Sequence, residues 1–186
     1  MREPSVLSST RNMARTALIA VDVQNDYLPD GPLGIPGSDS IIEPLVEYAT
    51  LVAEVVILSR TLHPPDRDCW AACIKGSTGA KIVPDLAALG SGPNTYVTTS
   101  RPVNYSAFEG GTLRPLSTLE DILTHERVTH VTVGGYWLEY RVAQTALDAN
   151  ALGYDTVVDP LSTFPFDEGL VDDTIERLAR AGVAYA

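Results

Sequence analysis

Short apolar runs rich in β-branched residues recur along the chain, each separated from the next by enough residues for a helix. Each run is apolar throughout rather than alternating, which is typical of parallel strands covered on both faces. A chain in which strands alternate with helices predicts an α/β fold, with a parallel sheet between two layers of helices. The expected strands are 17–23, 52–58, 95–98, 128–133 and 156–158, with a last short strand in "GVAYA".

Helices are expected between these strands, and their ends carry suitable residues. Ser38 and Asp39 can cap the first helix, while Gly153 and Gly182 stand where a left-handed residue ends a helix. Long loops follow the first and third strands; in an open parallel sheet such loops form the walls of a pocket. The expected helices are 39–51, 84–89, 116–125, 139–152 and 168–181.

Length and charge restrict the class of protein. The 186 residues, 45% of them hydrophobic, are enough for one domain, predicted over 16–186 after a tail of 1–15. The formal net charge of −11 argues against a nucleic-acid surface, which needs clustered cations. The apolar runs are too short for a membrane span, and no signal-peptide-like stretch follows the N-terminus, so a cytoplasmic protein is expected.

The only cysteines, Cys69 and Cys73, lie four apart in an expected helix. Two cysteines at this spacing provide neither a disulfide framework nor a four-ligand metal site. We therefore expect ordinary, partly buried thiols.

The stretch "GGYWLEYRVAQTALDANALGY", residues 134–154, joins the fourth expected strand to a helix. A strand that ends at glycines and continues into a helix is a common place for chemistry in α/β proteins, because backbone N–H groups converge there. Arg141 stands in the first turn of this helix, where a cation opposes the helix dipole.

Four segments occur in a recognisable order: "ALIAVDVQNDYLPDG", "KGSTGAKIVPDL", "RPVNYSAFEGGTL" and "GGYWLEYRVAQTALDANALGYDTVVD". Together they resemble the isochorismatase-like, or cysteine hydrolase, superfamily, which includes nicotinamidases, other amidohydrolases and isochorismatase. The resemblance covers roughly 16–163. It implies a three-layer α/β sandwich with a Rossmann-like parallel sheet, and a catalytic triad of aspartate, lysine and cysteine.

Matching the motifs residue by residue retains only part of that triad. Asp22 corresponds to the aspartate, and Gln24 and Asp26 complete its motif. The lysine position falls on Arg101 or Thr99, of which we prefer Arg101, and the cysteine position is Arg141. The resemblance also implies a cis peptide between Tyr136 and Trp137, and oxyanion donors in the N–H groups of Trp137 and Arg141.

The metal site of the nicotinamidase branch does not carry over. Its three ligand positions correspond here to Thr61, His63 and Arg67, and one histidine does not make a zinc or iron site. We therefore expect no metal and no cofactor, and His63 is interpreted as a polar packing residue.

Arg141 excludes the thioester mechanism of the family and leaves two alternatives. Its guanidinium could pair with Asp22 and fill the old triad site, or Arg141 and Arg101 could bind an anion beside a functional Asp22. Members of the superfamily that act on a vinyl ether lack the cysteine and use the aspartate to protonate a carbon. Those members keep the lysine, which puts isochorismate itself in doubt as the substrate.

The sequence thus favours an enzyme of secondary or small-molecule metabolism in which Asp22, Arg101 and Arg141 act on a small, possibly carboxylate-bearing molecule. Hydrolysis, elimination and isomerisation all remain open; the alternative is an inactive pseudoenzyme that serves as a ligand-binding or partner subunit. A homo-oligomer, dimer or tetramer, is expected as is common in the family. Candidate substrate-binding residues are Gln24, Tyr27, Tyr105, Phe108, Tyr136 and Trp137.

Overall fold

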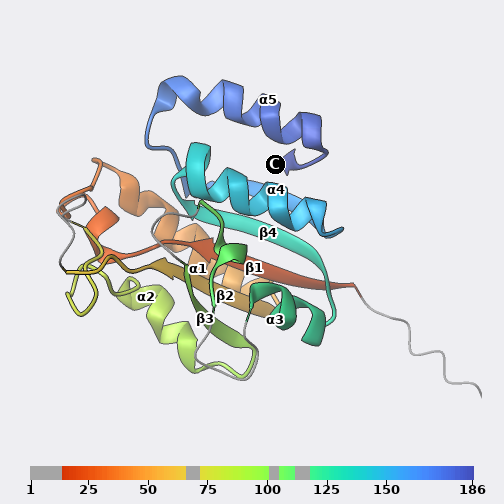
Figure 1. Ribbon diagram of the computed structural model, residues 1–186, viewed down its shortest axis with the longest axis horizontal. Coiled ribbons are helices and arrows are strands. Elements are labelled where there is room, and N and C mark those ends of the chain that lie inside the picture. Colours follow the sequence, from red (N-terminus) through yellow and green to blue (C-terminus); the bar gives the residue numbers. More distant parts are fainter. Residues whose placement is uncertain (1–13, 66–71, 101–104, 112–117) are drawn as a thin grey trace, which may run out of the picture.

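The computed structural model describes residues 14–65, 72–100, 105–111 and 118–186. Within these residues the strands form one six-stranded parallel sheet in the order β3-β2-β1-β4-β5-β6 (Figure 1). In the central strand, Ile19 lies beside Ile57 of β2 and Val133 of β4. The strands are β1 Arg15–Val21, β2 Val55–Thr61, β3 Thr95–Ser100, β4 Val128–Tyr136, β5 Asp155–Phe164 and β6 Ala184–Tyr185.

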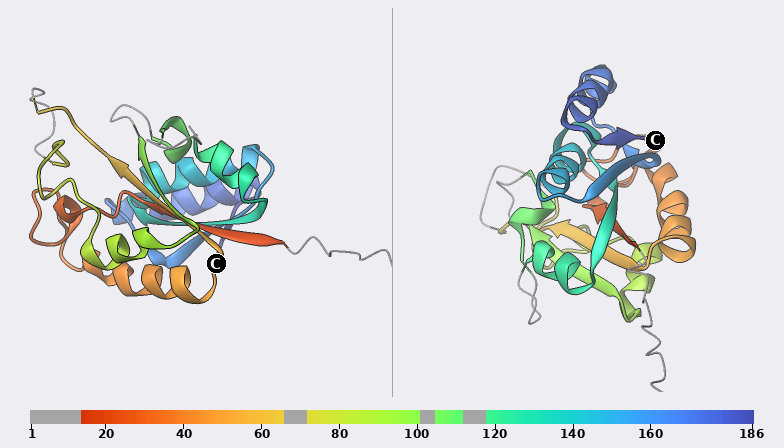
Figure 2. Two further views of the ribbon diagram at one scale, coloured as in Figure 1. Left: turned by 90° about the horizontal axis from the view of Figure 1, so that it is seen from below. Right: turned by 90° about the vertical axis from the view of Figure 1, so that its right-hand side faces the viewer.

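Helices cover both faces of the sheet, as the alternation of strands and helices predicts. Helices α1 and α2 lie against one face, and α3, α4 and α5 lie against the other (Figure 2, left). The α/β fold with a parallel sheet between helical layers is therefore confirmed. The helices are α1 Ile42–Leu51, α2 Pro84–Ala87, α3 Leu119–His125, α4 Ala143–Ala151 and α5 Val171–Ala181.

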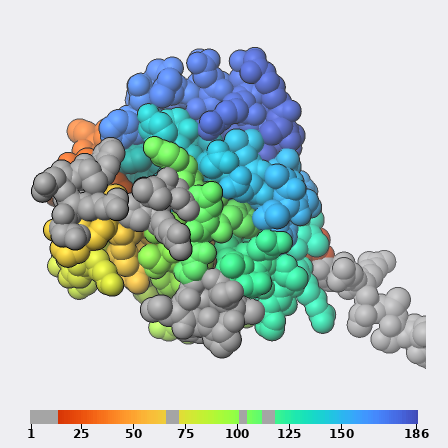
Figure 3. Space-filling view, viewed as in Figure 1, coloured from red at the N-terminus to blue at the C-terminus, as the bar shows by residue number. Residues whose placement is uncertain are grey.

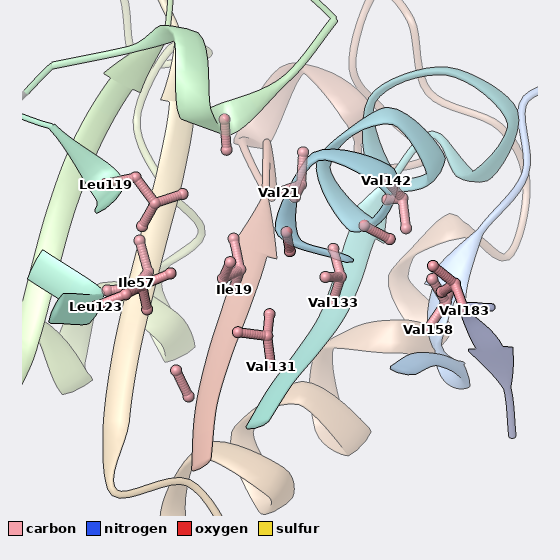
Figure 4. Packing of buried hydrophobic residues seen from close by; sticks show 14 of the residues in the cluster. Ile19, Val21, Ile57, Leu119, Leu123, Val131, Val133, Val142, Val158 and Val183 are labelled. Carbon is pink, nitrogen blue, oxygen red and sulfur yellow. The ribbon is translucent and has the colours of Figure 1, made fainter. Parts of the chain in front are cut away.

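Strand β1 explains why the apolar runs do not alternate. Ile19 and Val21 pack toward α3 and α4, where Figure 4 shows them beside Val133 and Val142. Leu18 and Ala20 point to the opposite face, into the core under α1 and α2. Successive side chains of a strand alternate between the faces, so burial on both faces requires an uninterrupted apolar sequence.

Several predicted boundaries differ from the structure. The second strand begins at Val55 rather than residue 52, because the apolar run "LVAEVVIL" contains both the end of α1 and the start of β2. Leu51 and Val52 are exposed at that junction. Helix α3 begins at Leu119, after Thr118 forms a reciprocal capping box with Asp121.

Strand β5 is longer than predicted and extends through Pro160 to Phe164, with a register shift against β4. Ser38 does not cap the first helix; its hydroxyl donates to the carbonyl oxygen of Tyr27 (2.8 Å). Asp39 makes no capping hydrogen bond either. Gly153 and Gly182 do end α4 and α5 with positive φ, as predicted.

The short helix η4, Ala107–Glu109, fixes the loop after β3 to the helical layer. It lies against α4, as the adjoining green and cyan atoms of Figure 3 show. The hydrogen bond from the Ala107 N–H to the Thr145 hydroxyl (3.0 Å) joins the two. In the described part of the chain, no helix has the length and apolar character needed to cross a membrane.

Candidate active site

Four polar side chains meet at the carboxyl ends of four neighbouring strands. Asp22 follows β1, Thr61 ends β2, Ser100 ends β3 and Arg141 lies just after β4. Strands β2 and β4 flank β1 on opposite sides, so the order of the strands reverses direction at β1. Ligands of open α/β sheets bind at such a switch point.

Asp22 is almost fully buried and has a left-handed backbone, with 1% exposure and φ of 53°. Aspartate adopts this conformation more readily than most residues, at a cost of about 1 kcal/mol. The Asp22 N–H donates to the carbonyl oxygen of Ser59 (3.0 Å), and the Asp22 carbonyl oxygen accepts the Gln24 N–H (2.8 Å). These bonds turn the chain sharply and direct the carboxyl group toward β4.

Arg141 faces this carboxyl group from the turn after β4. Its Nε forms an ion pair with Asp22 Oδ2, and its Nη2 donates a hydrogen bond to Ser100 Oγ. Thr61 Oγ1 donates to the same Oδ2 atom (2.9 Å). Residues from all four strand ends are therefore joined in one polar cluster.

The backbone around Arg141 is a π-turn, Leu138–Val142, that leads into α4. The predicted cis peptide between Tyr136 and Trp137 is present just before it. The carbonyl oxygen of Trp137 accepts the N–H groups of Tyr140 (3.3 Å) and Val142 (3.2 Å). The predicted helix at 139–152 thus begins as a wider turn, and a π-turn inside a helix is often a functional position.

Two glycines allow β4 to approach its neighbours closely before this turn. Gly135 has a φ of 120°, and a Cβ atom there would lie 2.1 Å from the carbonyl oxygen of Val21. A Cβ atom on Gly134 would lie 2.6 Å from the carbonyl oxygen of Ser162. Only glycine fits at these positions, which fixes the start of the turn against β1 and β5.

Burial dominates the electrostatics of the cluster. Desolvation raises the pKa of Asp22, and the positive charge of Arg141 and the Thr61 hydroxyl oppose this rise. Asp22 Oδ1 is buried and has no hydrogen-bond partner among the described residues. Desolvation, followed by the charge of Arg141, lowers the pKa of His63 and so favours the neutral imidazole.

A cavity of about 320 Å³ opens beside Arg141. At its inner end Thr61, Arg141 and Trp137 are buried, whereas Tyr105, Tyr140 and Phe166 at the outer end are exposed. The cavity therefore combines a polar, charged floor with an aromatic mouth. Its lining residues are Tyr27, Leu33, Thr61, His63, Tyr105, Trp137, Tyr140, Arg141 and Phe166.

Of the predicted substrate-binding residues, Tyr27, Tyr105 and Trp137 line this cavity. Tyr136 is buried behind it, and its hydroxyl donates to the carbonyl oxygen of Ser38 (2.5 Å). Phe108 packs against the core under α3 and α4. Neither of these two side chains is among those that line the cavity.

Gln24 supports the site from behind. It is fully buried, donates to the carbonyl oxygens of Thr61 and Ala80 (both 2.9 Å), and accepts the Thr61 N–H (2.8 Å). Asp26 accepts the N–H of Cys73, and its carboxylate lies where a side chain on Gly79 would be. The motif after β1 thus binds the loop that follows β2.

Sequence reasoning missed the roles of Thr61 and Ser100, both of which end a strand. The Thr61 hydroxyl donates to Asp22, and the Ser100 hydroxyl accepts a hydrogen bond from Arg141. The signal in the sequence was a polar residue at the carboxyl end of each of these strands, where a site is expected. Thr99 points elsewhere, because its hydroxyl accepts a hydrogen bond from Arg60 Nε (3.3 Å). Arg101, the preferred candidate for the lysine position, lies outside the described residues.

Tyr140 and Phe166 also escaped sequence reasoning. Tyr140 directly precedes Arg141, and its place in the turn could have indicated a pocket position. Phe166 comes from the loop after β5, which carries no motif of the family resemblance.

The positions that correspond to a metal site do not fit a metal. The Thr61 hydroxyl is already bonded to Asp22, His63 is one imidazole, and Arg67 lies outside the described residues. Among the residues that the structure describes, no group of three or more histidine, cysteine or acidic side chains is placed to hold an ion. His63 lines the cavity rather than serving only as a packing residue.

Cys73 is not helical, contrary to the expectation, but lies in a bend with φ of 53°. Its thiol is fully buried, and desolvation raises the pKa of the thiol to about 12. A thiol in this state is a poor nucleophile. Cys69 lies outside the described residues.

Comparisons with known proteins agree with this geometry. The sequence model described as "Isochorismatase domain" matches residues 16–184. The chain is 29% identical over 174 residues to a nicotinamidase of Escherichia coli, covering 76% of this chain and 79% of the relative. It is 29% identical over 160 residues to a nicotinamidase/pyrazinamidase of Mycobacterium tuberculosis, covering 77% and 84%.

Solved structures show the same fold. The zinc complex of a pyrazinamidase of Pyrococcus horikoshii superposes with a TM-score of 0.79 at 25% identity, over 92% of this chain and 98% of the other. A yeast nicotinamidase gives a TM-score of 0.80 at 21% identity, over 91% and 99%.

Proposed function

This chain belongs to the isochorismatase domain family, and we propose that it binds a small, flat, carboxylate-bearing molecule in the cavity beside Arg141 without forming a covalent intermediate. The observation that carries the proposal is that Arg141 takes part in two features at once. Its guanidinium pairs with Asp22 and also forms part of the cavity lining. A guanidinium is rigid, always charged and shaped to hold a carboxylate.

The surroundings of Arg141 support an anionic, ring-shaped ligand. Tyr27 and Trp137 lie beside it, with their rings 5.3 Å apart between centroids. The backbone N–H groups of Trp137 and Arg141, which correspond to the oxyanion donors of the family, are proposed to bind one carboxylate oxygen. In relatives named nicotinamidase the ligand is an amide; we propose that this chain prefers the corresponding acid.

Calorimetric titration with nicotinate, benzoate and nicotinamide tests this proposal. We expect both acids to bind about tenfold more tightly than the amide, because the charge-assisted bond to Arg141 is lost with the amide. Arg141→Lys keeps the charge but not the planar fork, and should weaken acid binding. Arg15→Met, which removes a cation outside the cavity, serves as the matched control. Equal affinity for acid and amide would contradict the proposal.

A second candidate function is acid–base catalysis by Asp22. The raised pKa of this carboxyl, together with the unpartnered Oδ1 atom, favours it. In the present arrangement Arg141 covers Asp22, so a bound carboxylate would have to draw the guanidinium aside. Asp22 could then protonate or deprotonate the ligand, either in a hydrolysis in which water is the nucleophile or in an elimination or isomerisation, which needs no nucleophile.

If Asp22 is the acid–base catalyst, Asp22→Asn should abolish turnover of any carboxylate substrate that the wild-type protein converts. The circular dichroism spectrum should stay unchanged. A panel of small acids with enol ether or β-leaving groups, followed by mass spectrometry, would detect such turnover. If wild type and Asp22→Asn both leave every acid intact but bind the acids, the chain acts as a ligand-binding or partner subunit.

Three expectations from the sequence stay predictions. They are a homo-oligomer, a cytoplasmic location and a role in small-molecule metabolism. Light scattering of the purified protein would measure the first directly.

A further inference from the structure

We infer that the ligand of this site is an elongated acid with two aromatic rings, its carboxylate at Arg141 and its second ring against an aromatic rim. The rim consists of Tyr105, Tyr140 and Phe166. This inference rests on the proposed binding of an anion at Arg141 and specifies which class of acid the site accepts.

A continuous series of ring contacts leads from the floor of the cavity to its mouth. Trp137 contacts Phe166 with centroids 5.4 Å apart, and Phe166 contacts Tyr140 at 6.4 Å. Tyr140 in turn contacts Tyr105 at 6.3 Å. These separations fall in the range of favourable aromatic pairs, in which the rings present both faces and edges to a neighbour. A ligand ring placed anywhere along this series would meet another ring.

Exposure divides the series into two parts. Tyr27 and Trp137 are 7% and 8% exposed, whereas Tyr140, Phe166 and Tyr105 are 40%, 48% and 62% exposed. The inner pair is already packed in the core under α1 and α2. The rim therefore presents most of the ring surface that a ligand could still cover.

A buried carboxylate holds the rim in place. Glu139 is 6% exposed, and its carboxylate accepts the N–H of Phe166 (2.9 and 3.1 Å) and the N–H of Asp167 (2.5 Å). Arg177 donates to the carbonyl oxygen of Glu139 (3.0 Å). Burying a carboxylate is costly unless such bonds satisfy it. Glu139 thus links the loop that carries Phe166 to the turn that carries Tyr140 and Arg141.

The shape and polarity of the cavity agree with an elongated acid. Its volume of about 320 Å³ lies within the range of pockets that enclose drug-sized ligands. Thr61, His63 and Arg141 supply the polar groups at the inner end, and the rim is aromatic. A ligand that is charged at one end and aromatic at the other matches both ends.

Calorimetry with two matched acids tests the inference. Biphenyl-4-carboxylate extends benzoate by one ring in line with the carboxylate. We expect it to bind wild-type protein about tenfold more tightly than benzoate, because its second ring would bury its surface against the aromatic residues of the rim. In Tyr140→Ala and in Phe166→Ala this ratio should fall to about twofold or less. Leu161→Ala, which removes an exposed apolar side chain from β5 outside the cavity, should keep the full ratio.

Glu139 is expected to act as a positioning residue, and the same ratio reports on it. Glu139→Gln retains an oxygen acceptor for the N–H groups and should keep most of the ratio, whereas Glu139→Ala should lose it. A merely structural role would lower the melting temperature and weaken both acids alike, which would leave the ratio unchanged.

The outcomes separate the two proposals. If benzoate and biphenyl-4-carboxylate bind wild type equally well, and both bind more weakly to Arg141→Lys, the two-ring ligand is wrong and the anion site stands. If neither acid binds wild type, the anion site fails and the two-ring ligand fails with it. A full ratio that survives Phe166→Ala and Tyr140→Ala would also overturn the inference.

Discussion

The two ends of β1 carry the same kind of ion pair in different surroundings. At the amino end, Arg15 Nη1 lies 2.7 Å from Glu126 Oε2 and also donates to the Glu126 carbonyl oxygen (2.7 Å). At the carboxyl end, Arg141 pairs with Asp22. The side chains of the first pair are 28% and 11% exposed, in the order arginine and carboxylate, against 11% and 1% in the second.

The pKa shifts of the two carboxyl groups have opposite signs. At Glu126 burial alone would raise the pKa, but hydrogen bonds from Tyr96 and Arg15 outweigh it and lower the pKa. At Asp22 burial outweighs Arg141 and Thr61, and the pKa rises. An arginine thus stabilises a carboxylate that keeps some contact with water more effectively than one that has lost it. The first pair joins α3 to the sheet, whereas the second places a charged guanidinium beside a cavity.

The largest expected effect comes from breaking the buried pair. Arg141→Met leaves the Asp22 carboxylate buried without its partner, which should lower the free energy of unfolding by about 3–5 kcal/mol. Asp22→Asn combined with Arg141→Met should recover most of this loss, because an amide and a thioether need no counter-ion. Urea unfolding of both variants measures the difference. A double variant as unstable as the single one would contradict the account.

Breaking the outer pair should cost less. Glu126→Gln keeps a hydrogen-bond acceptor for Tyr96 and Arg15 but removes the charge, so we expect a loss of about 1 kcal/mol. The same urea titration measures it, with Glu176→Gln, from an exposed pair on α5, as the matched control. A loss as large as that of Arg141→Met would show that burial does not distinguish the two ends.

The smallest effect is a difference in pH dependence. Because the folded pKa of Glu126 lies below its unfolded value, the stability it contributes is present above the unfolded pKa and is lost as pH falls through the folded pKa. The folded pKa of Asp22 lies above its unfolded value, so its unfavourable contribution grows as pH rises from the unfolded toward the folded pKa.

Unfolding free energies of wild type, Glu126→Gln and Asp22→Asn from about pH 7 to about pH 4 would check both signs. On acidification, the advantage of wild type over Glu126→Gln should shrink. The advantage of wild type over Asp22→Asn should grow. Parallel slopes would mean that the two carboxyl groups are in equivalent environments.

Much of the fold could be predicted from the sequence, because burial on both faces produces a pattern that is visible without coordinates. Apolar runs such as "ALIAV" predict central strands, and Gly153 and Gly182 end their helices as glycines do. The boundaries were less predictable. Thr118 and Asp121 decide where α3 begins through a side-chain bond, and Leu51 and Val52 look like strand residues although they end a helix.

The site was predictable only where it follows the family motifs. The motifs predict an ion pair between Asp22 and Arg141 as one of two alternatives, and a cis peptide before Trp137; the structure contains both. Thr61, Ser100 and Phe166 come from three separate strands or loops. Their convergence depends on the order of the strands in the sheet, which no local pattern encodes.

The tight approach of Gly135 to Val21 bears on how such a site can evolve. Because a side chain at Gly135 would overlap the neighbouring strand, selection is expected to remove replacements of this glycine. The side chain of Arg141, one turn later, lines the cavity and pairs with Asp22. New activities on this scaffold are therefore expected to arise by exchange of single side chains that line the cavity, on an unchanged turn.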